Sequence, residues 1–349
     1  MHFIEHSKPT IGKEEKQSLI NVLKTGFLAE GDVVRKFEQE LSEHIGSNGA
    51  VATSTGTLAL HLALVTLGVG KGSEVIVPSY VCRSLLNALA YSGARPVVCD
   101  VNKKDYNISF AHARKKISRR TKAVIVPHMF GCPAEVDKFK SLGIFVIEDC
   151  AHSIGAQYKD KNLGSWGDLA VFSFEGTKYI VAGEGGMVAA NSPALLKKMR
   201  ELKDLDSLGY KTKYTYRMTN LQAAVGREQL LKLGSFIKKR QTIATAYSSA
   251  FSGLNLDLPS DTYAGRHIFH RYMVGMQQDI TAFMKRCYRK GVKVKQPVKP
   301  LPLHRYLGLS DSDFPNTVHI MRSVVSIPIY PSLTSKQLEY IIRVVKGAI

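Results

Sequence analysis

Short, fully apolar runs alternate with segments of helical periodicity from residue 51 to about residue 190, and this alternation restricts the possible folds. The runs are too short for helices and are typical of strands buried on both faces. The predicted strands are Val75–Val77, Pro96–Cys99, Ala123–Val126, Phe145–Ile147, Ala170–Phe174 and Gly186–Ala190. Helix-like stretches lie between several of them, at 57–68, 83–92, 109–118 and 135–141. The pattern predicts an α/β fold with a mostly parallel central sheet flanked by helices.

A second, smaller unit is predicted at the C-terminal end of the chain. Amphipathic stretches precede the alternating region, at about 12–25 and 33–46, and helical character dominates from about 192 to 251. The segment SGLNLDLPS then has loop composition, and HIFHRYMVGM, a helix near 279–290 and GVKVKQPV follow it. We therefore predict a large domain at 1–251 and a small α+β domain at 252–349. Active sites in such sheets collect at the carboxyl ends of the strands.

The charge balance is basic, with 48 Lys and Arg against 29 Asp and Glu and a net charge of +19. Such a balance attracts anions, of which nucleic acid and a nucleotide diphosphate are two candidates. The basic residues are scattered in short groups, and the chain has no zinc-finger, RRM or helix-turn-helix signature. Solvated helix faces account for most of this charge, and we expect no nucleic-acid partner.

Location and redox state follow from the apolar runs and the cysteines. No run approaches the ~18 apolar residues of a membrane span, and the N-terminal MHFIEHSKPTIGKEEKQ has acids and a proline where a signal peptide needs an apolar core. We expect a cytoplasmic protein without a membrane partner. The five cysteines show no CxxC spacing, which argues against a disulfide framework and predicts no metal site.

Lys178 is the first candidate for chemistry. It lies in FSFEGTKYIVAGEGGMV, just past a predicted strand and before a glycine-rich stretch. Partial desolvation of such a lysine lowers the pKa of its amine, so that the neutral form can make a Schiff base. A surface lysine on a loop would have the same local sequence, so this motif alone leaves both interpretations open.

A strand ending in Glu148 and Asp149, followed by His152, supplies a second candidate group in IFVIEDCAHSIGA. A carboxylate at a buried strand end needs a cation or a hydrogen-bond donor. The protonated pyridine nitrogen of pyridoxal phosphate (PLP) is such a partner, and pairing with an Asp keeps the ring an electron sink. A metal-binding or helix-capping Asp is the alternative.

The beginning of an apolar helix in TSTGTLALHLALVTLG supplies a third group. Gly56 and Thr57 lie where the helix begins, so free backbone N–H groups and the helix dipole favour an incoming anion such as a phosphate. An ordinary Ser/Thr helix cap explains the same residues.

In this order, the motifs resemble the DegT/DnrJ/EryC1/StrS family of sugar aminotransferases, PLP enzymes of the aspartate-aminotransferase-like fold type I. The matching segments run nearly end to end and read GFLAEGDVVRKFEQELSEHIG, TGTLALHLAL, EVIVPSYV, IEDCAHSIGA, FSFEGTKYIVAGEGG, YRMTNLQAAVGREQL and PLPLHRYLG. The resemblance implies a homodimer with shared active sites, a nucleotide-linked keto-sugar as substrate and L-glutamate as the amino donor.

The resemblance also implies residue roles. Lys178 would bind PLP covalently and move protons, Asp149 would pair with the ring nitrogen, and His152 would approach the phenolic oxygen of the ring. Further cofactor contacts would come from Gly56, Thr57, Ser173, Tyr80 on the ring face, and Thr215. Substrate contacts would come from Arg217, Asn220 and His304, the first two reaching across a dimer interface.

Three positions distinguish this sequence within the family it resembles. Thr215 in KYTYRM stands where relatives often have an asparagine, so we expect weaker phosphate binding from that side. Glu175 stands where many relatives have His or a small residue, which puts the substrate in doubt. A lysine at position 178, where the family's dehydratases have His, favours transamination. A cyclitol or other keto substrate, or a PLP-binding regulator without turnover, stays open as an alternative.

Overall fold

The structure is a computed structural model, and it describes residues 3–203, 212–259 and 265–349. A central sheet of seven strands has the order β1-β9-β8-β5-β4-β2-β3. The strands of this sheet are β1 (Gly49–Thr53), β2 (Glu74–Pro78), β3 (Arg95–Cys99), β4 (Thr121–Pro127), β5 (Phe145–Asp149), β8 (Leu169–Ser173) and β9 (Gly186–Ala190). Only β9 runs antiparallel to its neighbours. The sheet is therefore mostly parallel, as predicted.

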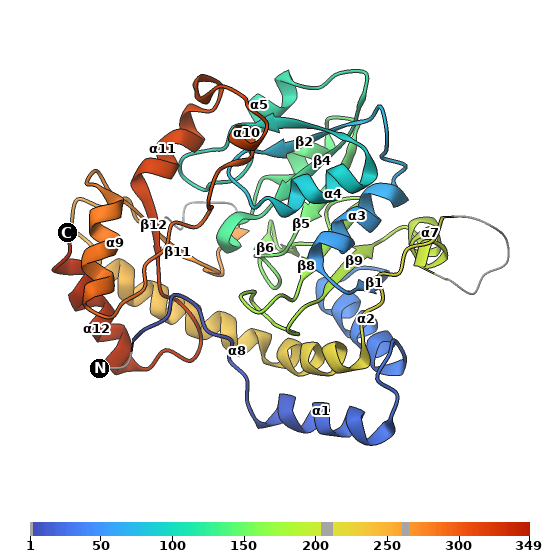
Figure 1. Cartoon of the computed structure of the whole chain (residues 1–349), viewed down its shortest axis with the longest axis horizontal. Helices are drawn as coiled ribbons and strands as arrows, with labels where there is room; N and C mark the ends of the chain where they lie inside the picture. The colour runs from blue at the N-terminus through green and yellow to red at the C-terminus, as the bar shows by residue number, and fades with distance from the viewer. Residues whose placement is uncertain (1–2, 204–211, 260–264) are drawn as a thin grey trace.

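Helices cover both faces of this sheet (Figure 1). One face packs against α2 (Asp32–Ile45), α5 (Phe110–Lys115), α6 (Val136–Lys140) and the first half of α8 (Asn220–Phe251). The other face packs against α3 (Gly56–Thr66), α4 (Ser84–Ser92) and α7 (Pro193–Lys203). Alternate residues of a strand point to opposite faces, so Val124 and Val126 join the first core and Ala123 and Ile125 the second. This double covering explains why the strand sequences are apolar throughout.

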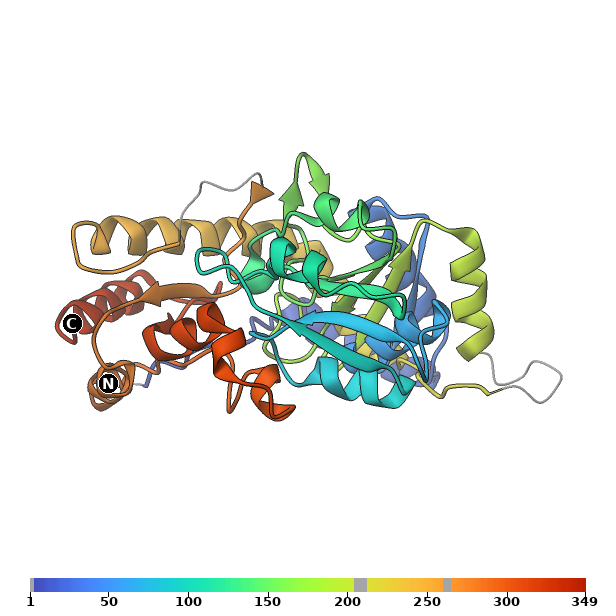
Figure 2. The ribbon, with the colours of Figure 1, turned by 90° about the horizontal axis from the view of Figure 1, so that it is seen from above.

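A third hydrophobic core lies at the other end of the molecule, around a two-stranded sheet of β11 (Tyr272–Gly275) and β12 (Val324–Ile327). The helices around it are α9 (Ile280–Arg289) and α12 (Ser335–Lys346), while α11 (Pro315–Ser323) and the short α10 (Leu303–Tyr306) pack toward the central sheet. In Figure 2 this orange and red unit stands beside the central sheet, and α8 extends along both.

Helix α8 connects the two units because its two halves belong to different cores. Leu230 and Leu233 pack in the core of the central sheet, whereas Tyr247 and Phe251 pack in the third core. Ile4 also joins the third core and pairs with Val292. The domain boundary after residue 251 stays a prediction.

The remaining elements are peripheral. They are α1 (Lys13–Thr25), which packs on α8, and the short strands β6 (Gln157–Tyr158), β7 (Lys161–Asn162) and β10 (Gly265–Arg266), which form a small separate sheet. Six predicted strands of the central sheet are present with nearly the predicted bounds, and β1 at its edge was not predicted. Residues 204–211 of the region predicted as mainly helical lie outside the described residues.

Candidate active site

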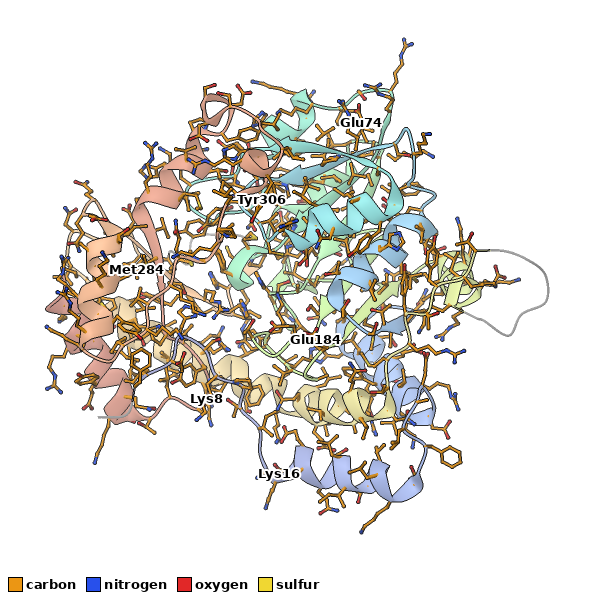
Figure 3. All side chains as sticks on the ribbon, viewed as in Figure 1. Lys8, Lys16, Glu74, Glu184, Met284 and Tyr306 are labelled. Carbon is orange, nitrogen blue, oxygen red and sulfur yellow. The ribbon has the colours of Figure 1, made fainter. Side chains whose placement is uncertain are left out.

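A cavity of about 440 Å³ opens at the carboxyl ends of β5 and β8 and at the beginning of α3. Five residues predicted from the sequence line this cavity, namely Gly56, Thr57, Asp149, Ser173 and Lys178. Cys82, Glu175 and Glu184 contribute further polar side chains to its wall. Glu184 is labelled near the centre of the molecule in Figure 3, on the loop between β8 and β9. The parallel strand order brings together groups that are far apart in sequence.

The beginning of α3 forms one end of the cavity. The Thr55 side chain accepts a hydrogen bond from the Leu58 N–H and caps the helix. The N–H groups of Gly56 and Thr57, in the first turn, are then available to an anion, and the helix dipole favours it. A Cβ atom at position 56 would lie 2.7 Å from Cβ and 2.8 Å from Oγ of Ser173. Only glycine lets the Ser173 hydroxyl approach this helix so closely. Gly56, Thr57 and Ser173, here called the α3 cradle, could hold a phosphate.

Asp149 ends β5 and points into the cavity. Its Oδ1 accepts a hydrogen bond of 3.0 Å from the Ala151 N–H. Burial raises the pKa of the Asp149 carboxyl, while the Ala151 N–H and the positive charge of Lys178 oppose that rise. A half-buried carboxylate with one oxygen bound by a single N–H group has further capacity to accept a hydrogen bond from a cation.

Lys178 lies on the loop between β8 and β9, and this loop is anchored on both sides. The Lys178 N–H donates to the Glu175 carbonyl at 2.9 Å, and the Ala182 N–H donates to the Phe174 carbonyl at 2.8 Å. The next residue, Tyr179, is buried, donates its hydroxyl to the Ile268 carbonyl and lies under the guanidinium of Arg240 at 4.7 Å. These contacts fix the backbone that carries the amine.

His152 lies next to the cavity, within a stack of rings. Its imidazole stacks on His270 with centroids 4.4 Å apart and on Phe130 at 5.9 Å. Burial lowers the pKa of His152 well below its usual value, and the charges of Lys178 and Arg271 lower it further. The ring is therefore neutral at physiological pH. A neutral imidazole can still donate one hydrogen bond.

Tyr80 and His304 are buried away from the cavity wall. Tyr80 is fully buried against Tyr106 and Phe130, and its hydroxyl has no hydrogen-bond partner among the described residues. His304 Nδ1 lies 2.5 Å from Ser79 Oγ, and its Nε2 lies 2.9 Å from Asp311 Oδ1. Both ring nitrogens of His304 are thus occupied within the fold. The predicted contacts of Tyr80 with the cofactor ring and of His304 with the substrate stay predictions.

Thr215 and Arg217 lie on an extended segment whose side chains alternate in direction. Tyr214 and Tyr216 turn inward and pack edge-on against His61, whereas Thr215 and Arg217 are exposed. Asn220 begins α8 and is buried. Its Oδ1 accepts from the Val34 N–H at 3.3 Å, and its Nδ2 donates to the Phe27 carbonyl at 2.9 Å. None of these three predicted residues is among those that line the cavity within the described chain.

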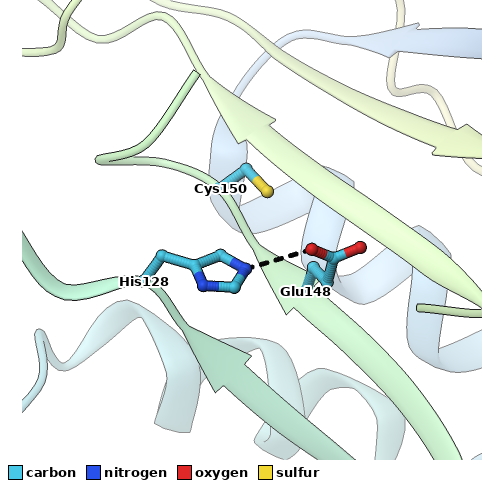
Figure 4. A group of neighbouring side chains, drawn as sticks. All are labelled: His128, Glu148 and Cys150. Atoms are coloured by element: carbon cyan, nitrogen blue, oxygen red, sulfur yellow. Dashed lines mark hydrogen bonds and ion pairs between the residues drawn. The ribbon is translucent and has the colours of Figure 1, made fainter. Parts of the chain in front are cut away.

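His128, Glu148 and Cys150 form a buried group of the kind that can hold a metal (Figure 4). Glu148 Oε2 accepts from His128 Nε2 at 3.1 Å and from the Gly164 N–H, and Oε1 accepts from the Trp166 and Gly167 N–H groups. The Ala134 N–H donates to the other ring nitrogen of His128, at 3.0 Å. The carboxylate and both ring nitrogens already have hydrogen-bond partners. We therefore interpret this group as a hydrogen-bond network that holds the end of β5 in place, and we call it the Glu148 network.

The groups that line the cavity are chemically suited to bind PLP. The α3 cradle suits the phosphate, Lys178 offers a primary amine to the aldehyde, and Asp149 offers a carboxylate to the ring nitrogen. Cys82 and Glu184 are cavity residues that the sequence analysis did not identify. Cys82 follows Tyr80 by two residues at the end of β2, so the general rule for carboxyl ends of parallel strands could have indicated it.

The comparisons with known proteins identify the family of this chain. The model of the DegT/DnrJ/EryC1/StrS aminotransferase family matches residues 9–346. The chain belongs to this family. Spore coat polysaccharide biosynthesis protein SpsC of Bacillus subtilis is 33% identical, with 99% of this chain and 98% of that protein covered. GDP-perosamine synthase of Escherichia coli O157:H7 is 32% identical, with 98% and 97% covered.

Solved structures support the same assignment. The aminotransferase TlmJ from Streptoalloteichus hindustanus superposes with a TM-score of 0.92 at 28% identity, with 99% of this chain and 98% of that chain covered. DesV from S. venezuelae, solved with a ketimine intermediate, gives a TM-score of 0.90 at 29% identity, with 96% and 94% covered. The predicted family, fold type I, aminotransferase class and PLP cofactor are confirmed. Within the described residues, no helix has the length and apolar character needed to cross a membrane.

Proposed function

We propose that this aminotransferase transfers an amino group from L-glutamate to a keto-sugar linked to a nucleoside diphosphate. The observation that carries the proposal is the shared cavity of Lys178, Asp149 and the α3 cradle. The names of the relatives support the substrate class, since GDP-perosamine synthases from several bacteria are 30–32% identical to this chain. The net charge of +19 also suits an anionic substrate.

Bound PLP supplies an electron sink for the carbanion character that develops at the reacting carbon. The side chains and backbone of the protein would bind the cofactor and transfer the protons. The first turn of α3 and Ser173 hold the phosphate, and the Asp149 carboxylate stabilises positive charge on the ring nitrogen. The Lys178 amine accepts the proton from the amino-bearing carbon of the donor and delivers a proton to the sugar carbon.

The environment of Lys178 suits proton transfer. The amine is partly buried on an anchored loop, so its position varies little between the two half-reactions. His152 is neutral because burial holds its pKa well below the usual value. It can therefore donate a hydrogen bond to the phenolic oxygen without adding a positive charge beside the amine.

We also propose a homodimer in which Thr215 and Arg217 enter the partner's cavity. Both side chains are exposed and face away from their own subunit's aromatic cluster. A row of exposed apolar side chains lies on and after α1, including Leu23 at 57% and Phe27 at 79% exposure. Burying such a row between subunits would stabilise the dimer. A cytoplasmic location stays part of this proposal.

The direct test is a panel of nucleotide-linked keto-sugars and free keto-cyclitols, offered to protein in its pyridoxamine form. Conversion of at least one nucleotide-linked compound to the amino-sugar, with return of the PLP absorbance, is the expected result. Conversion of cyclitols alone would contradict the substrate assignment. A protein whose PLP absorbance is unaffected by L-glutamate and by other amino donors would instead be a regulator without turnover.

A further inference from the structure

Several basic side chains gather between Lys178 and the two-stranded sheet of the C-terminal unit. His270 and Arg271 immediately precede β11, and His270 stacks on His152 at 4.4 Å. The positive charges of Lys178 and Arg271 both act on His152. Glu175, on the cavity wall, is in turn close enough to Arg271 to influence its protonation. Because His152 follows Ala151 of the cavity wall and stacks on His270, the residue before Arg271, the chain places Arg271 near this cavity.

Arg271 has an unusual partner for a half-buried guanidinium. Its NH1 group donates to His6 Nδ1 at 3.1 Å, and His6 Nε2 lies 2.9 Å from Ser326 Oγ. His6 is buried and neutral, because burial, followed by the charge of Arg271, lowers the pKa of its ring well below the usual value. Among the described residues Arg271 forms no ion pair with a carboxylate. Burial, together with the charge of Arg240, lowers the pKa of Arg271 to about 10.

Two further groups lie near Arg271, namely a buried imidazole nitrogen without a partner among the described residues and an exposed amine. His270 is 1% exposed, and its Nδ1 has no hydrogen-bond partner within the described chain. Burial, and then the charges of Lys293 and Arg271, lower the pKa of the Lys295 amine. A half-buried guanidinium that forms no ion pair with a carboxylate and a buried ring nitrogen without a partner both cost free energy. An anion bound between these groups would remove both costs.

We propose that Arg271, with His270 and Lys295 beside it, binds an oxyanion of the substrate next to Lys178. A guanidinium presents two parallel N–H donors, which fit a carboxylate or a phosphate group. Arg271 is partly exposed, so a ligand can reach it. The inference rests on the proposed function, which supplies two sources of such a group. These sources are the carboxylates of the amino donor and the diphosphate of the nucleotide-linked sugar.

Binding at Arg271 would position the substrate for proton transfer. A bidentate contact fixes both the location and the orientation of the bound group. Because the site lies beside His152 and Lys178, the carbon attached to the bound group would be held near the amine. Arg271 is accordingly a binding and positioning residue, and it takes no part in moving protons.

The first experiment measures binding directly, on PLP-loaded protein fixed by borohydride reduction. The probes are 2-oxoglutarate for a carboxylate and inorganic pyrophosphate for a diphosphate, titrated calorimetrically. In the variant Arg271→Gln, affinity for one of the two probes should fall by at least about tenfold, as expected for loss of a charge-assisted hydrogen-bond pair. Weaker 2-oxoglutarate binding would identify the donor carboxylate, and weaker pyrophosphate binding would identify the diphosphate. Unchanged affinity for both probes would overturn the proposal.

Two further variants complete the design. Arg271→Lys keeps the charge, so it should fold like the parent protein and retain part of the affinity. Arg289→Gln removes an exposed arginine at the end of α9 and should leave both affinities within about twofold of the parent. If Arg289→Gln weakens binding as much as Arg271→Gln does, general charge attraction explains the effect and the proposal fails.

Kinetics of the two half-reactions separate this inference from the proposed function. Arg271→Gln should raise the KM of L-glutamate or of the nucleotide-linked sugar by at least about tenfold, with a smaller change in kcat. If no nucleotide-linked sugar is converted by the parent protein but probe binding still depends on Arg271, the proposed substrate is wrong and the anion site stands. If sugars are converted and Arg271→Gln changes neither KM nor probe affinity, the anion site is wrong and the proposed function stands.

Discussion

Asp149 and Lys178 line one cavity although Asp149 ends β5 and Lys178 follows β8, and the positive charge of Lys178 acts on the protonation of Asp149. Burial raises the pKa of the Asp149 carboxyl, whereas the ammonium form of Lys178 opposes that rise. A protonated ring nitrogen paired with the Asp149 carboxylate would likewise favour the ionised form of this carboxyl. The chemistry that we propose depends on the two side chains being held at the same carboxyl edge of the sheet.

Among the described residues that line the cavity, Lys178 alone has an amine that can form a Schiff base with PLP, and replacing it with alanine removes this group. Borohydride reduction followed by peptide mass analysis should show a pyridoxyl adduct on Lys178 of the parent protein and no adduct in Lys178→Ala. Transamination should fall by about 10³-fold or more, because the proton-transfer group is lost as well. Lys197→Ala, which removes an exposed lysine of α7, is the matched control. An adduct on a different lysine of the parent protein would refute the assignment.

The variant Asp149→Asn retains the shape of the side chain but not its charge. We expect the protein to bind PLP and to turn over about 10² to 10³ times more slowly, because the ring nitrogen no longer faces a carboxylate. Single-turnover absorbance measurements with L-glutamate would show the slower step. Activity within about threefold of the parent would mean that Asp149 does not interact with the ring.

A substitution at Gly56 tests whether the α3 cradle holds the phosphate of PLP. In Gly56→Ala the new Cβ would lie within 2.8 Å of two side-chain atoms of Ser173, so α3 or Ser173 must move. We expect the affinity for PLP to fall by about tenfold or more, measured by fluorescence titration of cofactor-free protein. Gly234→Ala on α8 is the control, since no heavy atom lies within 4 Å of the added Cβ. Equal PLP affinity in both variants would contradict the cradle.

A substitution at Glu148 tests whether the Glu148 network at the end of β5 stabilises the fold. Its carboxylate is fully buried and accepts hydrogen bonds from His128, Gly164, Trp166 and Gly167. Glu148→Ala should lower the free energy of unfolding by about 3–5 kcal/mol, because these donors lose their acceptor. Chemical denaturation measures the change, and Glu339→Ala on the exposed face of α12 should change it little. If Glu148→Ala lowers the free energy of unfolding as little as Glu339→Ala does, the Glu148 network does not stabilise the fold.

The same carboxylate predicts a dependence of stability on pH. Burial alone raises the pKa of Glu148, but the hydrogen bonds from His128 and the backbone outweigh burial and hold it below the ordinary value of 4.5. Since the folded state has the lower pKa, the stabilisation is complete above pH 4.5 and is lost as the pH falls through the folded value. The difference in unfolding free energy between the parent and Glu148→Gln should therefore shrink as the pH falls below 4.5. A difference that grows on acidification would reverse the sign of the assigned shift.

Shared active sites can be tested by mixing two inactive variants. If Arg217 reaches the partner's cavity, Lys178→Ala disables the cavity of its own subunit. Arg217→Ala then disables the cavity of the partner subunit. Mixed dimers would then contain one intact cavity, and random mixing should restore about a quarter of the parent activity. Refolding the two chains together and assaying turnover measures this recovery. No recovery in confirmed mixed dimers would place Lys178 and Arg217 in the same subunit's cavity.

The sequence by itself determined the local structure and the chemistry of the cavity. Apolar runs such as Ala123–Val126 are strands because both faces of the sheet are covered, and the pattern shows this without any long-range information. Lys178, Asp149 and Gly56 could be identified because each follows a strand or begins a helix in a characteristic motif. The edge strand β1 was missed, since GAVAT is short and rich in small residues.

Only the tertiary structure decided which of these residues meet. The strand order places the ends of β5 and β8 beside the beginning of α3, although these elements lie far apart in sequence. It also separates Glu148 from Asp149, because neighbouring strand residues point to opposite faces, and it occupies both ring nitrogens of His304 within the fold. The cluster around Arg271 has no sequence signature. Arg271 donates to His6, which lies 265 residues away in the sequence, and the burial of both side chains depends on contacts that no local pattern encodes.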